Sequence, residues 1–216
     1  MRLVVVSAGL SVPSSTRLLA DRLAAAAGRL APLDVQVVEV RELAVEIAHA
    51  FTSGFPGRAL AAAQEAVTAA DGLIVVTPVF SASYSGLFKS FFDLLDQDAL
   101  AGTPVLTAAT GGTARHSLVL EHALRPLFSY LRAVVVPTGV YAASEDWGAE
   151  GLDGRIERAA AELTGLMTGL TAARPARPGP DDGFTVVPFA DRLAALAPPS
   201  EGERTVGVPR PVPPSR

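Results

Sequence analysis

Short runs of apolar and β-branched residues recur along the chain at intervals that suit alternating strands and helices. The runs that predict strands are Leu3–Ser7, Val35–Val40, Leu73–Thr77, Val105–Ala109 and Val134–Val136. All but the second are almost wholly apolar rather than alternating, which is typical of strands buried on both faces. The polar residues Gln36 and Glu39 interrupt the second run, so we expect that strand nearer an edge of the sheet.

Stretches rich in Ala and Leu separate these runs and predict helices. Their ranges are Ser15–Arg29, Gly57–Ala70, Leu87–Asp96, His116–Leu131 and Asp153–Leu170. Strands that alternate with helices of this length favour parallel pairing with right-handed crossovers, and hence a three-layer α/β sandwich. A five-stranded parallel sheet favours the flavodoxin-like order 2-1-3-4-5 over a six-stranded dinucleotide fold.

The composition changes after Ala173, where Arg174–Pro180 and later Val208–Arg216 are rich in proline. Because proline cannot continue a helix, we divide the chain into a domain over residues 1–172 and a partly mobile extension over 173–216. Within the extension, Phe184–Leu196 is apolar enough to form a short element that docks on the core or on a second subunit. Alternatively, Phe184–Leu196 is simply part of a mobile segment.

Charge and composition exclude several function classes. A net charge of −4 makes a nucleic-acid partner unexpected, and the absence of cysteine excludes disulfide scaffolds and thiolate metal sites. His49, His116 and His122 lack the spacing of metal ligands, so we expect no metal site. The apolar N-terminal run is too short for a signal peptide, and no uncharged run approaches the roughly 18 residues of a membrane span. We therefore expect a cytoplasmic protein that binds no membrane.

The segment after the first predicted strand, residues 7–17, gathers hydroxyl side chains at the start of a helix. It contains neither the Gly-Lys-Ser/Thr of nucleoside triphosphate loops nor G-x-G-x-x-G. Ser14, Ser15 and Thr16 stand where free backbone N–H groups and the helix dipole attract an anion. One of them suffices to cap the helix, so three in a row favour a phosphate site that suits a mononucleotide.

Two further loops follow the third and fourth predicted strands. In the first of them Pro78 is expected to end the strand, which leaves Phe80 and Tyr84 as an apolar wall for a planar ring. Lys89 and Asp93, four residues apart on the next helix, are expected to form an ion pair. In the other loop the paired glycines Gly111 and Gly112 let the backbone approach a ligand closely.

Together the three loops resemble those of the NADPH-dependent FMN reductase family of flavodoxin-like proteins. The loop ending at Arg17 resembles the family's Ser-rich loop, and residues 77–93 resemble its T-P-x-Y/F…G-x-x-K-x-x-x-D segment. Residues 109–112, with His116 shortly after, match its third flavin loop. The likeness covers residues 1–170 and is greatest to reductases that supply reduced FMN to luciferase-like monooxygenases. The extension from Ala173 has no match in the family's common core.

The resemblance assigns roles to residues in each loop. It implies that the FMN phosphate is held by Ser14, Ser15 and Thr16, with Ser7 and Arg17 as further candidates. It implies that the isoalloxazine lies beside Pro78, Val79, Phe80 and Ser81, and that its pyrimidine edge meets Thr110, Gly111, Gly112 and Thr113. Arg115 and His116 either add positive charge or hold the phosphates of NADPH, or they form only the solvated start of a helix.

The activity that the resemblance implies is hydride transfer from NADPH or NADH to FMN, with reduced FMN passed to a flavin-dependent monooxygenase. The cofactors carry this chemistry, so no catalytic acid or base is expected. A quinone, azo-dye or chromate reductase with tightly bound FMN is the main alternative, because it would use the same loops. A flavodoxin-like electron carrier is another, although such carriers tend to be more acidic.

Apolar side chains crowd two of the predicted helices beyond what one face of the sheet is expected to cover. They are Phe88, Phe91, Phe92, Leu94 and Leu95 on one helix, and Leu124, Leu127 and Phe128 on the next. Apolar patches of this kind mark subunit contacts. Because the resembling family is commonly dimeric or tetrameric, we expect a homodimer or homotetramer.

Overall fold

The computed structural model describes residues 1–173, and their side chains as far as Leu170. The expected partly mobile extension and its apolar segment Phe184–Leu196 lie outside the described residues. The division into a domain and an extension therefore stays a prediction.

A parallel sheet forms the centre of the described part of the chain. Its strands are β2 (Asp34–Glu39), β1 (Arg2–Ser7), β3 (Gly72–Phe80) and β5 (Pro104–Gly111), in that spatial order. The fifth position is shared by β6 (Val134–Val135) and β7 (Val140–Ala143), which both pair with β5. The order confirms the predicted 2-1-3-4-5, with β2 at an edge. The sheet has seven strands rather than five, because the last position is split and β4 (Ser83–Tyr84) forms a hairpin with β3.

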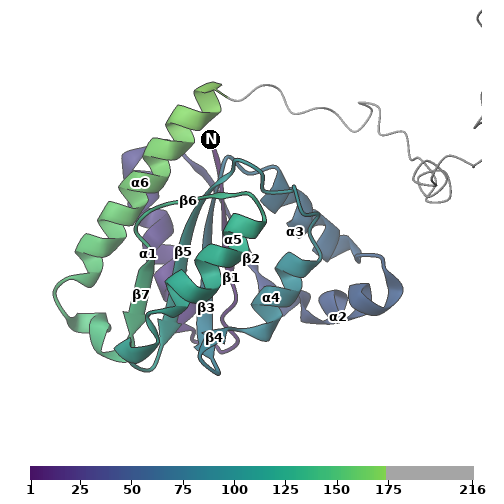
Figure 1. Cartoon of the computed structure of the whole chain (residues 1–216), viewed down its shortest axis with the longest axis horizontal. Coiled ribbons are helices and arrows are strands. Elements are labelled where there is room, and N and C mark those ends of the chain that lie inside the picture. The colour runs from purple at the N-terminus through teal and green to yellow at the C-terminus, as the bar shows by residue number, and fades with distance from the viewer. Residues whose placement is uncertain (174–216) are drawn as a thin grey trace, which may run out of the picture. The chain divides into compact units, whose positions relative to one another are not determined.

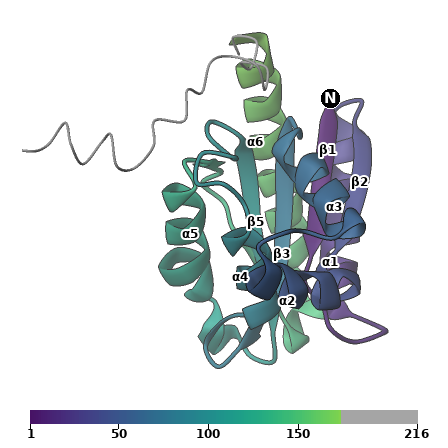
Figure 2. The ribbon, with the colours of Figure 1, turned by 90° about the vertical axis from the view of Figure 1, so that its right-hand side faces the viewer.

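Helices cover both faces of this sheet (Figures 1 and 2). One face carries α1 (Ser15–Leu30) and α6 (Leu152–Ala173). The other carries α2 (Ala44–Ser53), α3 (Arg58–Thr68), α4 (Gly86–Asp93) and α5 (Arg125–Tyr130). Successive residues of β1 enter the two cores alternately, so the three-layer sandwich and the double burial of its central strands are confirmed. Within residues 1–173 no helix is long and apolar enough to cross a bilayer.

Three local predictions were wrong or incomplete where backbone chemistry overrides the apolar pattern. The helix expected over His116–Leu131 is a 3-10 turn, a π-helical turn over Leu120–Leu124, and then α5. Pro126 has no N–H to donate to the preceding turn, which breaks the α-helical ladder there. Pro137 likewise separates β6 from β7. The helix α2 was missed altogether, although Gly54 ends it in the left-handed conformation that typically stops a helix.

The aromatic side chains expected to form a subunit contact are buried in the protomer's own core. Phe88, Phe91, Phe92 and Phe128 are at most 1% exposed and pack edge to face or tilted against one another. Leu124 is also fully buried. The prediction that these apolar side chains exceed what the protomer can bury was therefore wrong. One face of the sheet alone would not cover them, but α4 and α5 together do.

One buried hydroxyl in the middle of β5 gives a stability prediction. Thr107 is fully buried, and its Oγ1 has no hydrogen-bond partner among the described residues. A buried hydroxyl without a partner costs about 1–3 kcal/mol, so Thr107→Val should raise the free energy of unfolding by about 1 kcal/mol. Chemical denaturation measures this directly.

Thr77 on β3 provides the matched control for Thr107. It is also fully buried, but its hydroxyl accepts from the N–H of Ser85 and donates to the carbonyl of Pro78, both at 3.0 Å. Thr77→Val should therefore lower the free energy of unfolding by about 1–3 kcal/mol. Equal effects of the two substitutions would contradict the assignment of an unsatisfied hydroxyl to Thr107.

Candidate functional site

The candidate site lies at the carboxyl edge of the sheet, where the loops after β1, β3 and β5 meet. This edge is the lower one in Figure 1, next to β4. Open α/β sheets bind ligands outside the carboxyl ends of their strands, at the point where the strand order reverses. Here β1 and β3 are neighbours although β2 precedes β3 in the chain, so the reversal falls between the first two of these loops.

The loop after β1 leads into the N-terminus of α1 and leaves donors free there. Ser14 is the N-cap, and its Oγ accepts a hydrogen bond of 3.2 Å from the N–H of Arg17. The N–H groups of Ser15 and Thr16, in the first turn, have no acceptor within the helix. Ser15 is exposed and Ser14 half-buried, so their two hydroxyls are accessible to an anion, whereas Thr16 is buried. These donors fit a phosphate group.

Two other residues predicted for phosphate binding are buried beneath this loop. The hydroxyl of Thr16 forms a hydrogen bond of 2.8 Å with the hydroxyl of Thr110 at the end of β5, and both side chains are buried. This bond joins the first loop to the third, although the residues are 94 positions apart. Ser7 is fully buried, and its Oγ has no hydrogen-bond partner in the described part of the chain. Thr16 therefore positions the loop, while Ser7 keeps an unused donor under it.

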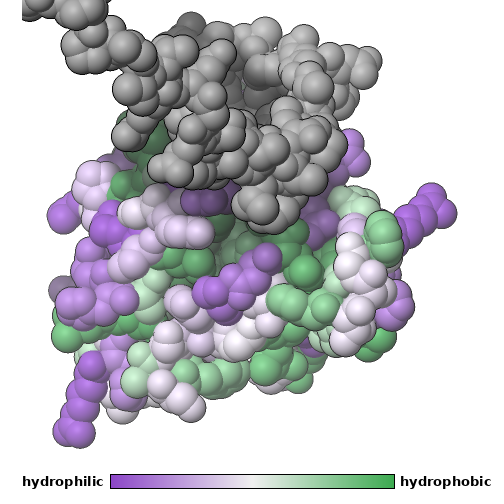
Figure 3. Space-filling model, turned by 45° about the vertical axis from the view of Figure 1, so that its right-hand side comes forward, coloured by the Kyte–Doolittle hydropathy of each residue, from purple (hydrophilic) through white to green (hydrophobic). Residues whose placement is uncertain are grey.

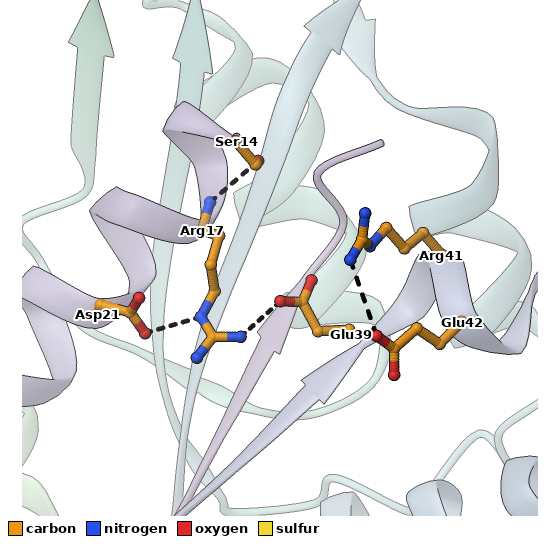
Figure 4. A network of polar contacts seen from close by, with 6 residues as sticks. All are labelled: Ser14, Arg17, Asp21, Glu39, Arg41 and Glu42. Atoms are coloured by element: carbon orange, nitrogen blue, oxygen red, sulfur yellow. Dashed lines mark hydrogen bonds and ion pairs between the residues drawn. The ribbon is translucent and has the colours of Figure 1, made fainter. Parts of the chain in front are cut away.

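Arg17, a further candidate for binding the phosphate, lies between two carboxylates, so its charge is paired (Figure 4). Its Nε donates to Asp21 over 2.7 Å, and its Nη1 forms an ion pair with Glu39 at the end of β2. These hydrogen bonds raise the pKa of the Arg17 guanidinium above its ordinary value. Arg17 thus ties the start of α1 to β2, and much of its charge is already balanced.

The second loop is a tight hairpin, and here the prediction that Pro78 ends the strand was wrong. The strand β3 continues through Pro78, which is paired with Thr110 of β5, to Phe80. A proline lacks only the N–H, so the strand can go on by pairing its last residues with β4 instead. The hairpin turn is Ser81-Ala82, with φ values of 49° and 66°.

Left-handed conformations at Ser81 and Ala82 are strained and fix the direction of the neighbouring side chains. Two such residues give the type I′ turn that matches strand twist, at a cost of about 1–2 kcal/mol each for side chains other than glycine. Phe80, just before the turn, is 47% exposed at this edge, and Val79 is half-buried.

The predicted ion pair between Lys89 and Asp93 on α4 is confirmed.

The third loop is anchored to β7 by a tyrosine that the sequence did not single out. The Tyr141 hydroxyl donates to the carbonyl of Thr113 over 2.8 Å. Burial raises the pKa of Tyr141, with Asp146 and Glu145 adding to the effect, so the hydroxyl keeps the proton that it donates. A Cβ on Gly111 would come within 2.1 Å of the Tyr141 hydroxyl oxygen. Glycine at 111 therefore avoids a clash with the Tyr141 side chain, whereas a Cβ on Gly112 would meet nothing within 4 Å.

The remaining predicted residues of this loop are exposed. Thr113 caps the short turn Ala114–His116 by accepting from the N–H of Arg115, and both Arg115 and His116 lie at the surface. Among the described residues no group of three or more His, Cys, Asp or Glu side chains is placed to hold a metal ion. The structure therefore joins the first loop to the third through Thr16 and Thr110, and holds the third on β7 through Tyr141. Pro78 of the second loop is paired with Thr110, and His116 lies at the surface.

Comparison with known proteins identifies the family. The model of the NADPH-dependent FMN reductase family matches residues 1–148. An FMN reductase (NADPH) of Pseudomonas aeruginosa is 42% identical over 173 residues, which cover 78% of this chain and 93% of the relative. An NADH-dependent FMN reductase of Pseudomonas fluorescens is 41% identical over 172 residues, covering 77% of this chain and 92% of the relative.

A solved structure gives the same answer for the fold. An oxidoreductase from Corynebacterium diphtheriae superposes with a TM-score of 0.75 at 52% identity, over 78% of this chain and 97% of that one. The sheet order and the layers agree with the flavodoxin-like fold expected from the sequence. The chain therefore belongs to the NADPH-dependent FMN reductase family.

Proposed function

We propose that the protein catalyses hydride transfer from NADPH or NADH to FMN and releases the reduced FMN for use by a flavin-dependent monooxygenase. The observation that carries the proposal is the convergence of three loops at the carboxyl edge of the sheet, where the Ser14 and Ser15 hydroxyls are accessible and the Thr16–Thr110 hydrogen bond joins the first loop to the third. FMN reductases that use NADPH or NADH are among its relatives, so both reductants are included.

In this proposal each loop has a separate task. The N–H groups of Ser15 and Thr16 and the hydroxyls of Ser14 and Ser15 bind the phosphate of FMN. Val79 and Phe80, held by the hairpin, lie along the flavin ring. The nucleotides themselves supply the hydride chemistry. The N–H groups of Gly111, Gly112 and Thr113 donate to the pyrimidine edge, where negative charge develops on reduction.

The exposure of Phe80 favours a flavin that leaves after each turnover. Phe80 is 47% exposed, and Tyr84, the other aromatic side chain of this loop, is turned toward Phe88 in the core. With no aromatic sandwich built from this hairpin, FMN should bind as a substrate of moderate affinity. The alternative is a prosthetic FMN that passes electrons to quinones, azo dyes or chromate.

Steady-state assays on flavin-stripped protein separate these two modes. Under anaerobic conditions, oxidation of NADPH or NADH should require added FMN, should saturate with it, and should yield one free reduced FMN per nucleotide oxidised. Gel filtration of protein loaded with FMN should separate the FMN from the protein. Stoichiometric retention of FMN, together with quinone reduction at full rate without added flavin, would favour the prosthetic alternative.

We further propose a homodimer or homotetramer, assembled through the side of the molecule that carries α4 and α5. A cleft of about 610 Å³ lies between these helices, with Leu95, Leu127 and Tyr130 among its lining residues. Tyr130 is 65% exposed, and apolar surface lies among polar surface on this side (Figure 3).

Light scattering at micromolar concentration should give a dimer or tetramer mass, and Tyr130→Glu should lower that mass by placing a charge in an apolar contact. Phe55→Glu is the control, because Phe55 is 77% exposed and does not line this cleft. A monomer mass for the unaltered protein would exclude the assembly.

We place the reaction in the cytoplasm, where pyridine nucleotides are the common reductants.

A further inference from the structure

The strand β7 ends beside the third loop, and the proposed FMN site does not use the turn that follows it. Gly111 at the end of β5 is paired with Ala143 at the end of β7. The chain then passes through the 3-10 turn Ser144–Gly148. The carboxylates Glu145 and Asp146 belong to this turn, so they follow closely on the partner of Gly111.

The two carboxylates differ in what they bind. The Oδ2 of Asp146 accepts from the N–H of Ala143 over 2.8 Å, and its Oδ1 forms an ion pair with Arg155 at 3.3 Å. Asp146 therefore holds the turn together, and its charge is balanced. Glu145 is exposed, and its side chain has no ion pair or hydrogen bond within the part of the chain that the structure describes. Its negative charge is available to act on a neighbouring ligand.

The charge of this turn reaches the third loop at Tyr141. The Tyr141 hydroxyl donates to the carbonyl of Thr113 and would meet a Cβ on Gly111, so it lies directly behind the loop. Burial raises the pKa of Tyr141 most, and the charges of Asp146 and Glu145 raise it further. The side of the third loop that faces β7 therefore lies in a negative field.

Positive groups near this loop do not neutralise Glu145. Arg155 is paired with Asp146. Arg115 and His116 are exposed on the turn after the loop, and neither forms an ion pair with a described residue. The charges that act on the Tyr141 hydroxyl are the two carboxylates. Glu145 thus remains a single unpaired negative charge beside the third loop.

Oxidised and reduced FMN differ in charge at the edge that this loop would contact. The oxidised ring is neutral, whereas the reduced ring carries negative charge around N1 and the C2 carbonyl. The N–H groups of Gly111 and Gly112 favour that charge, because they point positive dipoles at it. A nearby carboxylate opposes it by Coulomb repulsion. A carboxylate beside the loop therefore discriminates between two oxidation states of the same ligand.

We propose that Glu145 weakens the binding of reduced FMN relative to oxidised FMN and so favours release of the product. The inference rests on the proposed function, which places the pyrimidine edge of the flavin at Gly111–Thr113. Affinity and reduction potential are linked, so the same charge lowers the two-electron potential of bound FMN. Glu145 acts through space and contacts no reacting atom, which makes it a residue that tunes the site rather than a catalytic one.

Anaerobic calorimetric titration with oxidised FMN, and with FMN reduced beforehand, gives the ratio of the two dissociation constants. Glu145→Gln keeps the size of the side chain and removes its charge. It should strengthen the binding of reduced FMN about threefold and change that of oxidised FMN by less than about 1.5-fold, as expected of one exposed charge several ångströms from another. A tenfold change corresponds to about 30 mV in a two-electron couple, so the potential of bound FMN should rise by about 14 mV.

Charge reversal and salt separate a Coulomb effect from a change in shape. Glu145→Lys changes the charge by twice as much, so it should strengthen reduced FMN by about the square of the first factor, roughly ninefold. Raising the ionic strength from about 0.1 M to about 1 M shortens the screening length from about 10 Å to about 3 Å and should remove most of both effects. Glu150→Gln removes the same charge at an exposed position beyond the turn and should leave the ratio unchanged.

The other results have definite meanings. An unchanged ratio in both Glu145 variants, or weaker binding of reduced FMN in Glu145→Gln, would overturn the inference and leave the proposed function standing. An equal change of the ratio in Glu150→Gln, or an effect that salt does not reduce, would also overturn it. Failure of the unaltered protein to bind oxidised FMN would contradict the proposed function, and the inference with it.

Discussion

Ser14→Ala/Ser15→Ala should lower the affinity for FMN by at least tenfold and change the affinity for riboflavin by less than about threefold. Each hydroxyl that donates to a charged phosphate contributes about 1.5–3 kcal/mol. Riboflavin has no phosphate and makes none of these hydrogen bonds, so their removal does not weaken its binding. Thr16 is left unchanged, because its hydroxyl is bonded to Thr110 and its removal would disturb two loops at once. Titration of the protein with each flavin gives the two affinities.

The loss of a helix cap is the confounding effect in this variant, and α4 offers a matched control. Ser85 caps α4 as Ser14 caps α1, by accepting from a backbone N–H over 3.2 Å. Replacing either cap with Ala should cost about 1 kcal/mol of stability. Ser85→Ala should leave the ratio of FMN to riboflavin affinity unchanged. If Ser14→Ala/Ser15→Ala also leaves that ratio unchanged, the phosphate does not bind at the start of α1.

Most of the fold follows from patterns that are local in sequence. Continuous apolar runs mark strands buried on both faces, and the interrupted run Val35–Val40 correctly indicated the edge position of β2. The errors cluster at prolines, because one missing N–H changes pairing in ways that hydrophobicity does not record. Pro78 did not end β3, Pro137 divided the last strand position, and Pro126 accompanies a π-helical turn.

The candidate site was predictable only in part, for a different reason. Runs of Ser, Thr and Gly after strands are visible in the sequence, and those runs form the loops that the structure brings together. The partners of these loops are distant in the chain and carry no local signal. Thr16 meets Thr110, Arg17 meets Glu39, and Gly111 faces Tyr141. Such contacts depend on strand order and register, so they become apparent only once the sheet is assembled.

The contact between Gly111 and Tyr141 gives the second large effect that we expect. Gly111→Ala places a Cβ about 2.1 Å from the Tyr141 hydroxyl oxygen, far inside van der Waals contact. The ring must move, and the hydrogen bond from Tyr141 to the carbonyl of Thr113 is lost with it. We expect Gly111→Ala to lower the free energy of unfolding by about 2–3 kcal/mol and to weaken FMN binding severalfold, because the third loop loses its anchor.

A double-mutant cycle with Tyr141→Phe isolates this contact. Tyr141→Phe alone should cost about 1 kcal/mol, the usual contribution of one hydrogen bond. Without the hydroxyl, the nearest ring atom to the new Cβ is Cζ at 3.2 Å, which a small shift of the ring can accommodate. The double variant should therefore be more stable than the sum of the single losses by at least about 1 kcal/mol.

Gly112→Ala is the control for backbone effects at a neighbouring glycine. No heavy atom lies within 4 Å of the position that its Cβ would take, so we expect its stability to change by less than about 0.5 kcal/mol. Denaturant titration of the four Gly111 and Tyr141 combinations, and of Gly112→Ala, measures the free energy of unfolding of each variant. Additive losses in the cycle, or a loss in Gly111→Ala as small as that in Gly112→Ala, would show that Tyr141 does not restrict the third loop.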